Sequence, residues 1–114
     1  MDIKLQMKGR TLIANLIGEL DHHSAKTVKD MLETAIVNKS AQNMVFDLTD
    51  LTFMDSSGIG LMIGRYKLIT SIGGKVCIVS KSKTLNRLIS MSGLTKLMEI
   101  YQSTDDAVKS MGGM

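Results

Sequence analysis

The stretch Asp55-Ser56-Ser57-Gly58 holds the side chains best placed by their sequence context to take part in chemistry. An apolar run, residues 44–48, leads into this stretch, and an amphipathic run, residues 59–72, leads out of it. The two serines therefore lie where a strand unit gives way to a helix. A hydroxyl at such a junction can act as a nucleophile, accept a phosphoryl group, or cap the first turn of the helix.

A serine nucleophile requires a base, and the sequence offers only His22 and His23 for that role. Ser56 does not lie in the Gly-x-Ser-x-Gly pattern of a nucleophile elbow. The glycines of residues 58–64 have the spacing Gly-x-Gly-x-x-x-Gly, which is one residue longer than a dinucleotide-binding fingerprint and begins inside a predicted helix. The chain also contains no Walker-type phosphate loop. We therefore expect a protein that is not an enzyme and that holds no cofactor.

The two histidines directly follow Asp21. Successive side chains point in different directions, so one such pair with one carboxylate makes a poor metal site. A helix cap followed by two partly exposed imidazoles is the simpler interpretation of Asp21, His22 and His23, and no metal site is predicted.

Ser56 is better interpreted as a substrate than as a nucleophile. Phosphorylation would add about −1.5 to −2 charge and three acceptor oxygens at this position. A helix N-terminus favours a phosphate, whereas the neighbouring Asp55 repels it. We expect the phosphate to change the electrostatic face that a partner meets, without unfolding the protein. Ser57 is an adjacent alternative acceptor that spacing alone does not exclude.

Two glycines further along the same predicted helix, Gly60 and Gly64, are four residues apart and so share one helix face. This face leaves the backbone bare for close approach. Two interpretations are open: the bare face packs on the protein's own sheet, or a partner approaches it. Arg65 follows directly and is either a contact residue or a solvated charge.

Periodicity predicts the strands that position these residues. Ile3, Leu5 and Met7 alternate with polar residues, as in a half-buried strand, and a turn at Gly9-Arg10 joins this strand to a second one in a hairpin that Gly18 ends. Short apolar runs predict the remaining strands. The predicted strands cover residues 3–8, 11–17, 44–48, 76–79 and 97–100.

Apolar residues at helical spacing predict four helices between and after these strands. The predicted helices run from Asp21 or Ser24 to near Asn38, from about Ser57 to Ile72, from Ser82 to Gly93, and from Ser103 or Thr104 through Met111. Gly73-Gly74 closes the second helix, and Gly112-Gly113 is expected to fray the last one.

From residue 20 onward, helices alternate with short apolar strands, which predicts right-handed crossovers and a mostly parallel sheet. The opening hairpin makes that sheet mixed. The chain has 114 residues, no proline and no low-complexity linker. We therefore predict a single α/β domain over residues 1–114.

Composition narrows the function further. The chain is 44% apolar and 22% charged, which is ordinary for a soluble globular protein. Its net charge is only +3 and its aromatic content 4%, so we expect no direct binding of nucleic acid.

The single cysteine, Cys77, lies in a predicted buried strand and is expected to be an inert core thiol. No run approaches the ~20 apolar residues of a membrane span, and residues 1–4 lack a signal peptide's apolar region, so we expect a cytoplasmic protein.

The segment Phe53-Met54-Asp55-Ser56-Ser57-Gly58-Ile59-Gly60, continued by Gly64-Arg65-Tyr66-Lys67, resembles the signature of bacterial anti-sigma factor antagonists of the STAS domain family, in particular the sporulation sigma-F antagonists. Three further blocks match in the right order: Gly18-Glu19-Leu20-Asp21-His22-His23, Ile72-Gly73-Gly74 and Met91-Ser92-Gly93-Leu94. The resemblance implies a STAS-like fold, a mixed and mostly parallel sheet of about five strands with about four helices packed against it.

The resemblance also implies a function. The unphosphorylated protein is expected to bind an anti-sigma factor and so free a sigma factor for transcription. In that family the anti-sigma factor is also an ATP-dependent serine kinase that discharges the antagonist, and a separate serine phosphatase resets the switch. Ser56 aligns with the family's phosphoacceptor. The motif residues expected to contact the partner are Asp21, His22, Asp55, Ser57, Gly58, Gly60, Gly64 and Arg65. The alternative is a STAS-like regulatory module that binds a small ligand or a nucleotide.

Overall fold

The chain opens with the predicted hairpin, in a computed structural model that describes residues 1–112. β1 (Asp2–Lys8) pairs antiparallel with β2 (Thr11–Leu20). The apolar residues of β1 are half-buried and alternate with exposed polar ones, as the sequence predicts. β2 does not stop at Gly18, because this glycine adopts a φ of +107° at a register shift and the strand continues into a second pairing.

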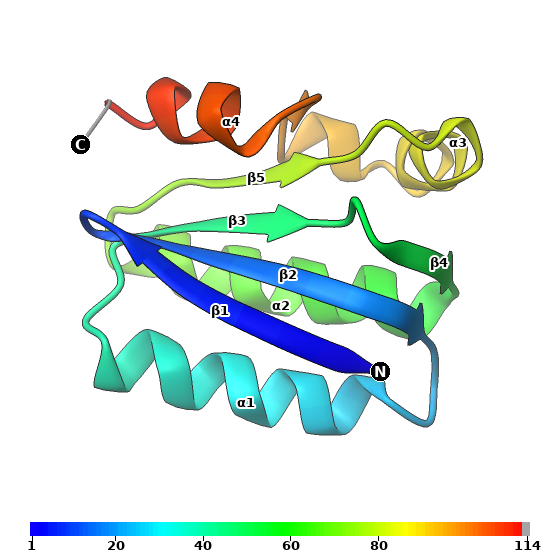
Figure 1. Ribbon diagram of the computed structural model, residues 1–114, viewed down its shortest axis with the longest axis horizontal. Coiled ribbons are helices and arrows are strands. Elements are labelled where there is room, and N and C mark those ends of the chain that lie inside the picture. The colour runs from blue at the N-terminus through cyan, green and yellow to red at the C-terminus, as the bar shows by residue number, and fades with distance from the viewer. Residues whose placement is uncertain (113–114) are drawn as a thin grey trace.

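The remaining strands run parallel to β2 (Figure 1). β3 (Asn43–Asp47) pairs with β2, β5 (Val76–Val79) pairs with β3, and β6 (Ile100–Tyr101) pairs with β5. β4 (Leu51–Met54) pairs with the far end of β2, beyond β3. The mixed, mostly parallel sheet is therefore confirmed, with six strands instead of about five.

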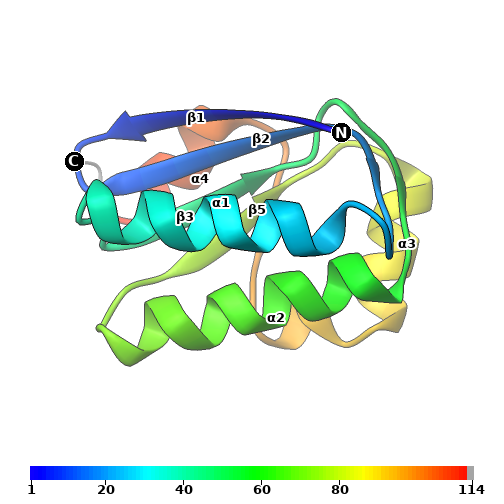
Figure 2. The ribbon, with the colours of Figure 1, turned by 90° about the horizontal axis from the view of Figure 1, so that it is seen from below.

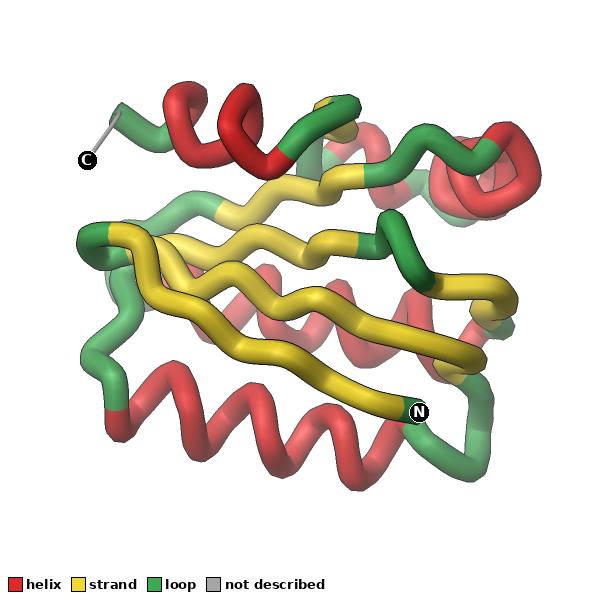
Figure 3. Tube along the Cα trace, in the orientation of Figure 1, coloured by secondary structure: helices red, strands yellow, loops and turns green. Residues whose placement is uncertain are grey.

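Helices cover the two faces of the sheet unequally (Figures 2 and 3). The long helices α1 (Ala25–Asn38) and α2 (Ser56–Ser71) lie side by side on one face. The short α4 (Thr104–Ser110) packs on the other face, against β3, β5 and β6. α3 (Lys83–Met91) lies at the end of the sheet where α2 begins. No helix within residues 1–112 is long and apolar enough to cross a lipid bilayer.

Each helical layer encloses its own part of the core. Alternate residues of a strand point to opposite faces, so in β2 the buried Leu12 and Leu16 face α1 and α2, while Ile13 packs toward α4 with Val45 of β3. The larger cluster also contains Phe46, which is fully buried. Burying side chains of this size contributes about 1.5–3 kcal/mol each. α2 is therefore a firmly held platform for the residues at its N-terminus.

Two parts of the sequence prediction are wrong. Residues 97–100 do not form the last strand: Gly93 takes a φ of +85°, residues Leu94–Lys96 form a 3₁₀ turn, and β6 is confined to Ile100–Tyr101. The apolar Leu97 and Met98 lie in the bend that follows this turn, so only Ile100 of the predicted strand joins the sheet. β4 was not predicted, because its central residues, Thr52 and Phe53, are exposed and break the buried pattern. The expected fraying of the last helix falls partly on Gly113, which lies outside the described residues.

Candidate functional site

Asp55 organises the junction between β4 and α2. Its backbone is extended, and its carboxylate accepts a hydrogen bond from the backbone N–H of Ser57 at 2.8 Å. The same carboxylate accepts a longer bond, 3.3 Å, from the backbone N–H of His22 in the loop that follows β2. Asp55 thus caps α2 and ties the loop to the cap. Of the roles open to the serine hydroxyls, capping α2 is excluded, because the Asp55 carboxylate occupies the capping position. The helix begins at Ser56, one residue before the predicted start near Ser57.

Ser56 is the first residue of α2 and its side chain is exposed, whereas Ser57 is half-buried. Within residues 1–112 the Ser56 hydroxyl has no hydrogen-bond partner, so nothing in the described chain restrains it. The N–H groups of a first helical turn have no partners within the helix and carry partial positive charge. A phosphate on Ser56 would therefore stand in open solvent beside favourable N–H dipoles and one unfavourable carboxylate.

The loop between β2 and α1 is held by hydrogen bonds to Asp21. Its carboxylate accepts from the backbone N–H groups of His23 and Ser24, at 2.9 and 3.0 Å. The bond from Ser24 in particular lowers the pKa of the Asp21 carboxyl group. Ser24 occupies the N-cap position of α1 without a side-chain capping bond; its hydroxyl instead donates to the carbonyl of Glu19 at 3.0 Å. Asp21 thus shapes the loop that Asp55 anchors.

His22 and His23 are exposed, and their rings meet edge to face with centroids 5.7 Å apart. Within residues 1–112 no three His, Cys, Asp or Glu side chains gather closely enough to hold a metal ion. The loop therefore offers these imidazoles to the surface beside the start of α2.

A groove of about 540 Å³ runs between α1 and α2, beginning next to Ser57. Its lining residues come from the loop and both helices: His22, Ala25, Lys26, Lys29, Ser57, Gly60, Leu61, Gly64 and Arg65. Cβ atoms added to Gly60 and Gly64 would meet nothing within 4 Å. The bare glycine face is thus directed into open space, which excludes the interpretation that it packs on the protein's own sheet.

Gly58 differs from these two glycines. It is buried, and a Cβ at this position would collide with the side chain of Met54 and come within 3.1 Å of Leu20. Gly58 is therefore needed for α2 to pack close to the ends of β2 and β4.

Arg65 is buried, with 6% of its surface exposed, and its Nη2 lies 2.9 Å from a carboxylate oxygen of Glu33 on α1. The interpretation of Arg65 as a solvated charge is therefore wrong. Glu33, Lys26 and Lys29 were not among the predicted site residues. Their spacing of three and four residues along one predicted helix marks a common face, and this is the signal that could have identified them.

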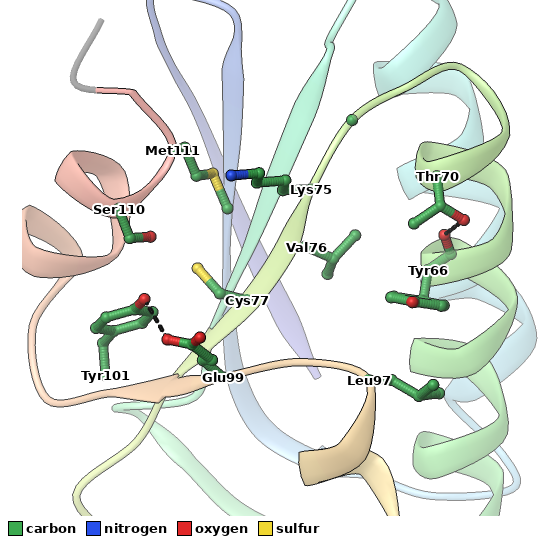
Figure 4. A pocket seen from close by; sticks show the side chains of 11 residues that line it. Tyr66, Thr70, Lys75, Val76, Cys77, Leu97, Glu99, Tyr101, Ser110 and Met111 are labelled. Atoms are coloured by element: carbon green, nitrogen blue, oxygen red, sulfur yellow. Dashed lines mark hydrogen bonds between the residues drawn. The ribbon is translucent and has the colours of Figure 1, made fainter.

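A second cavity, of about 280 Å³, lies where the C-terminal half of α2 approaches β5, β6 and α4 (Figure 4). Cys77 is buried in its wall, as predicted, and burial raises the pKa of the thiol to about 12. The Tyr101 hydroxyl donates to the Glu99 carboxylate at 2.6 Å, which raises the pKa of Tyr101. We call this cavity the Cys77 pocket, and in it the side chains of Tyr101 and Glu99 pair with each other.

Comparison with known proteins gives a consistent result. The family model described as STAS domain matches residues 2–107. The anti-sigma F factor antagonist of Paenibacillus polymyxa is 38% identical over 113 residues, covering 97% of each chain. The anti-sigma factor antagonist SpoIIAA in its unphosphorylated form superposes with a TM-score of 0.78 at 26% identity, covering 99% of this chain and 100% of that one. The phosphorylated form of the Bacillus cell fate determinant SpoIIAA gives 0.74 at 29% identity, covering 96% and 99%.

Proposed function

This chain belongs to the STAS domain family, and on that premise we propose that it is an anti-sigma factor antagonist controlled by phosphorylation of Ser56. The unphosphorylated form binds an anti-sigma factor and thereby releases a sigma factor. The phosphorylated form does not bind. Relatives named as antagonists of anti-sigma factors, and solved structures of one such protein with and without phosphate, support this proposal.

The observation that carries the assignment is the position of Ser56. Its hydroxyl is exposed at the first residue of a well-anchored helix and lies beside the α1–α2 groove. A phosphate there adds about −1.5 to −2 charge at the entrance to the groove. Charge and bulk at a protein–protein contact lower affinity through repulsion and desolvation.

The anti-sigma factor itself is proposed to act as the kinase. Its bound ATP would transfer the γ-phosphoryl group to the Ser56 oxygen, leaving ADP, while the hydroxyl proton passes to a base on the kinase. This chain contributes an acceptor that a kinase can reach. A separate serine phosphatase would hydrolyse the phosphoserine and restore the binding form.

The proposed contact residues divide into two groups by what they touch. His22, Ser57, Gly60, Gly64 and Arg65 line the groove and can meet a partner directly. The other three support the site without lining the groove. Asp21 and Asp55 hold the loop after β2 and the cap of α2, and Gly58 lets α2 pack against the ends of β2 and β4.

The test is to incubate the protein with ATP and its cognate anti-sigma factor and to map phosphate by mass spectrometry. Ser56→Ala should abolish incorporation and leave binding of the anti-sigma factor largely intact, while the matched Ser57→Ala variant should still be phosphorylated. Phosphate recovered on Ser57 in the wild-type protein would refute the assignment. No binding by the unphosphorylated protein would refute the proposed function as a whole.

The Cys77 pocket favours a second function, that of a module that binds a small ligand. Pockets for drug-sized molecules occupy about 300–1,000 Å³, so a cavity of about 280 Å³ suits a ligand smaller than a nucleotide. Thermal unfolding with and without candidate ligands measures this directly, because a ligand at 100 times its Kd stabilises the native state by about 2.7 kcal/mol.

A further inference from the structure

The guanidinium group of Arg65 is incompletely paired. Its side chain is only 8% exposed, and Nη2 forms the ion pair with Glu33. Nε and Nη1 are both buried, and residues 1–112 provide neither atom with a hydrogen-bond acceptor. An arginine stays charged at all relevant pH values and cannot shed these protons. Buried donors in folded proteins almost always have partners, so these two require an explanation.

Positive charge surrounds this arginine. Arg65 lines the α1–α2 groove together with Lys26 and Lys29, both exposed on α1. No Asp or Glu is found among the described residues that line the groove. Glu33 neutralises part of the charge from its position next to Arg65, but its own side chain is 42% exposed and contacts only one guanidinium nitrogen. The groove is therefore complementary to an anionic group.

The wall of the groove is open to a large partner. Gly60 and Gly64 present bare backbone on the α2 side, with space where side chains would otherwise project. A partner surface can therefore approach α2 more closely than a typical helix allows. The flexible stems of Lys26 and Lys29 stand along the opposite wall and can move aside.

We propose that the groove receives a carboxylate side chain, Asp or Glu, that projects from the anti-sigma factor and pairs with the free nitrogens of Arg65 once the guanidinium group turns from its buried position toward the groove. This inference rests on the proposed function, because it names the chemistry by which that partner is recognised. Guanidinium–carboxylate contacts are charge-assisted hydrogen bonds, which are roughly twice as strong as neutral ones. The carboxylate would complete a donor set that Glu33 leaves partly unused.

The position of the groove links this contact to the switch. Ser57 lines the end of the groove, and Ser56 is its neighbour in the first turn of α2. A kinase that reaches Ser56 must lay its surface across this end of the molecule. Phosphate on Ser56 then places negative charge close to the incoming carboxylate. Phosphorylation therefore weakens the pairing between this carboxylate and Arg65.

The proposal is tested by titrating the cognate anti-sigma factor with variants of the groove. Arg65→Gln should weaken binding tenfold or more, and a joint Lys26→Gln and Lys29→Gln variant should weaken it less and flatten its salt dependence. Lys109→Gln, on α4 across the sheet, is the matched control and should bind like wild type. Amide spectra establish whether each variant is folded. If Arg65→Gln does not fold, the variant of the two exposed lysines still tests whether the groove binds the partner.

A double-mutant cycle identifies the carboxylate. Each surface Asp or Glu of the anti-sigma factor is changed to Asn or Gln and measured against wild type and Arg65→Gln. One acid should weaken binding to wild type tenfold or more and have little effect with Arg65→Gln. The proposal is overturned if groove variants bind as tightly as wild type, or if no acid couples to Arg65. One such outcome has a specific meaning. If no acid couples to Arg65, and inorganic phosphate or ATP raises the thermal stability of wild type but not of Arg65→Gln, the groove is a site for small anions. Wild-type protein that fails to bind at all refutes the proposed function instead.

Discussion

The α1–α2 groove and the Cys77 pocket are both concave, and α2 contributes to both. Arg65 faces the first, and Tyr66, its neighbour in sequence, lines the second. In the Cys77 pocket Tyr101 pairs with Glu99, and no buried polar side-chain atom of the described lining residues lacks a partner. Beside the groove, two buried charged donors of Arg65 have no acceptor in the described chain.

The difference is that Arg65 beside the groove lacks acceptors, whereas the Cys77 pocket would recognise a small ligand mainly by its shape. A cavity whose donors and acceptors are already paired offers a ligand little beyond shape. A cavity with unpaired buried donors gains a charge-assisted bond when a partner arrives, and that gain is specific to the partner that carries the acceptor. Each prediction below changes one of the two regions and is expected to leave the other as it is.

The largest expected effect is the protection of Cys77. A thiol whose pKa rises from 9.0 to about 12 has its thiolate fraction at pH 8 reduced roughly a thousandfold, since each unit is a factor of ten. Iodoacetamide should therefore alkylate the native protein at least that much more slowly than the urea-unfolded chain. Native and unfolded rates within tenfold of each other would show that the Cys77 pocket opens readily.

The same shift gives a pH dependence of stability. The unfolded thiol loses its proton near pH 9 and the folded one near pH 12, so the contribution of Cys77 is fully present below pH 9 and is lost as pH rises from about 9 to about 12. Urea unfolding of wild type and Cys77→Ala across this range should show a steeper decline for wild type. Parallel declines would contradict the assignment.

The second effect is on binding. Ser56→Asp adds a carboxylate beside Asp55 at the entrance to the groove, and we expect it to weaken binding of the anti-sigma factor at least tenfold, through repulsion and desolvation. Ser110→Asp places the same charge beside the Cys77 pocket and should leave binding within twofold of wild type. Calorimetric titration at low and high salt measures both. Wild-type affinity for Ser56→Asp at both salt concentrations would argue against charge as the switch.

A smaller effect is expected at the caps. Asp55→Ala removes the bond to Ser57 and the bond to His22, and loss of a helix cap costs about 1 kcal/mol. Ser82→Ala is the matched variant, because Ser82 caps α3 through Leu85 at 3.2 Å. Both should lower the free energy of unfolding by a similar amount in urea titrations, but only Asp55→Ala should also weaken partner binding. Equal binding by the two variants would remove Asp55 from the site.

The sequence predicted most of this fold because alternation and helical spacing report directly on burial. Its errors lie where tertiary geometry decides. A serine and an aspartate both suit the N-cap, and only the structure shows that the Asp55 carboxylate takes it. Leu97, Met98 and Ile100 are apolar, but the left-handed backbone of Gly93 begins a turn that ends at Leu97, so the strand starts only at Ile100.

The sequence predicted which segment forms the candidate site, but it did not predict the interactions of the charged side chains there. The junction, the serines and the glycine face all follow from sequence patterns. The burial of Arg65 and its ion pair with Glu33 depend on how α1 docks beside α2. Helical spacing identifies a face of each helix separately, whereas the contact across the two helices requires the packed structure. The free nitrogens of Arg65 could therefore be found only in three dimensions.

The smallest expected effect is on the fold itself. The exposed dipole and like-charge terms that a Ser56 phosphate introduces are about 0.3–1 kcal/mol. Burial of apolar side chains such as Ile59, Met62 and Ile69 of α2 contributes about 1.5–3 kcal/mol each.

The packing of α2 therefore outweighs the new charge, and phosphorylation should act at the surface. Backbone amide shifts of the two forms should differ only near residues 20–24 and 52–66, since the loop and the cap share the Asp55 carboxylate. The β5, β6 and α4 residues of the Cys77 pocket serve as the internal reference: their amide shifts should stay the same, and the alkylation rate of Cys77 should not change. Shift changes spread through the sheet, at Val45, Ile78 or Leu97, would instead mean that the phosphate signal is carried through α2 into the core.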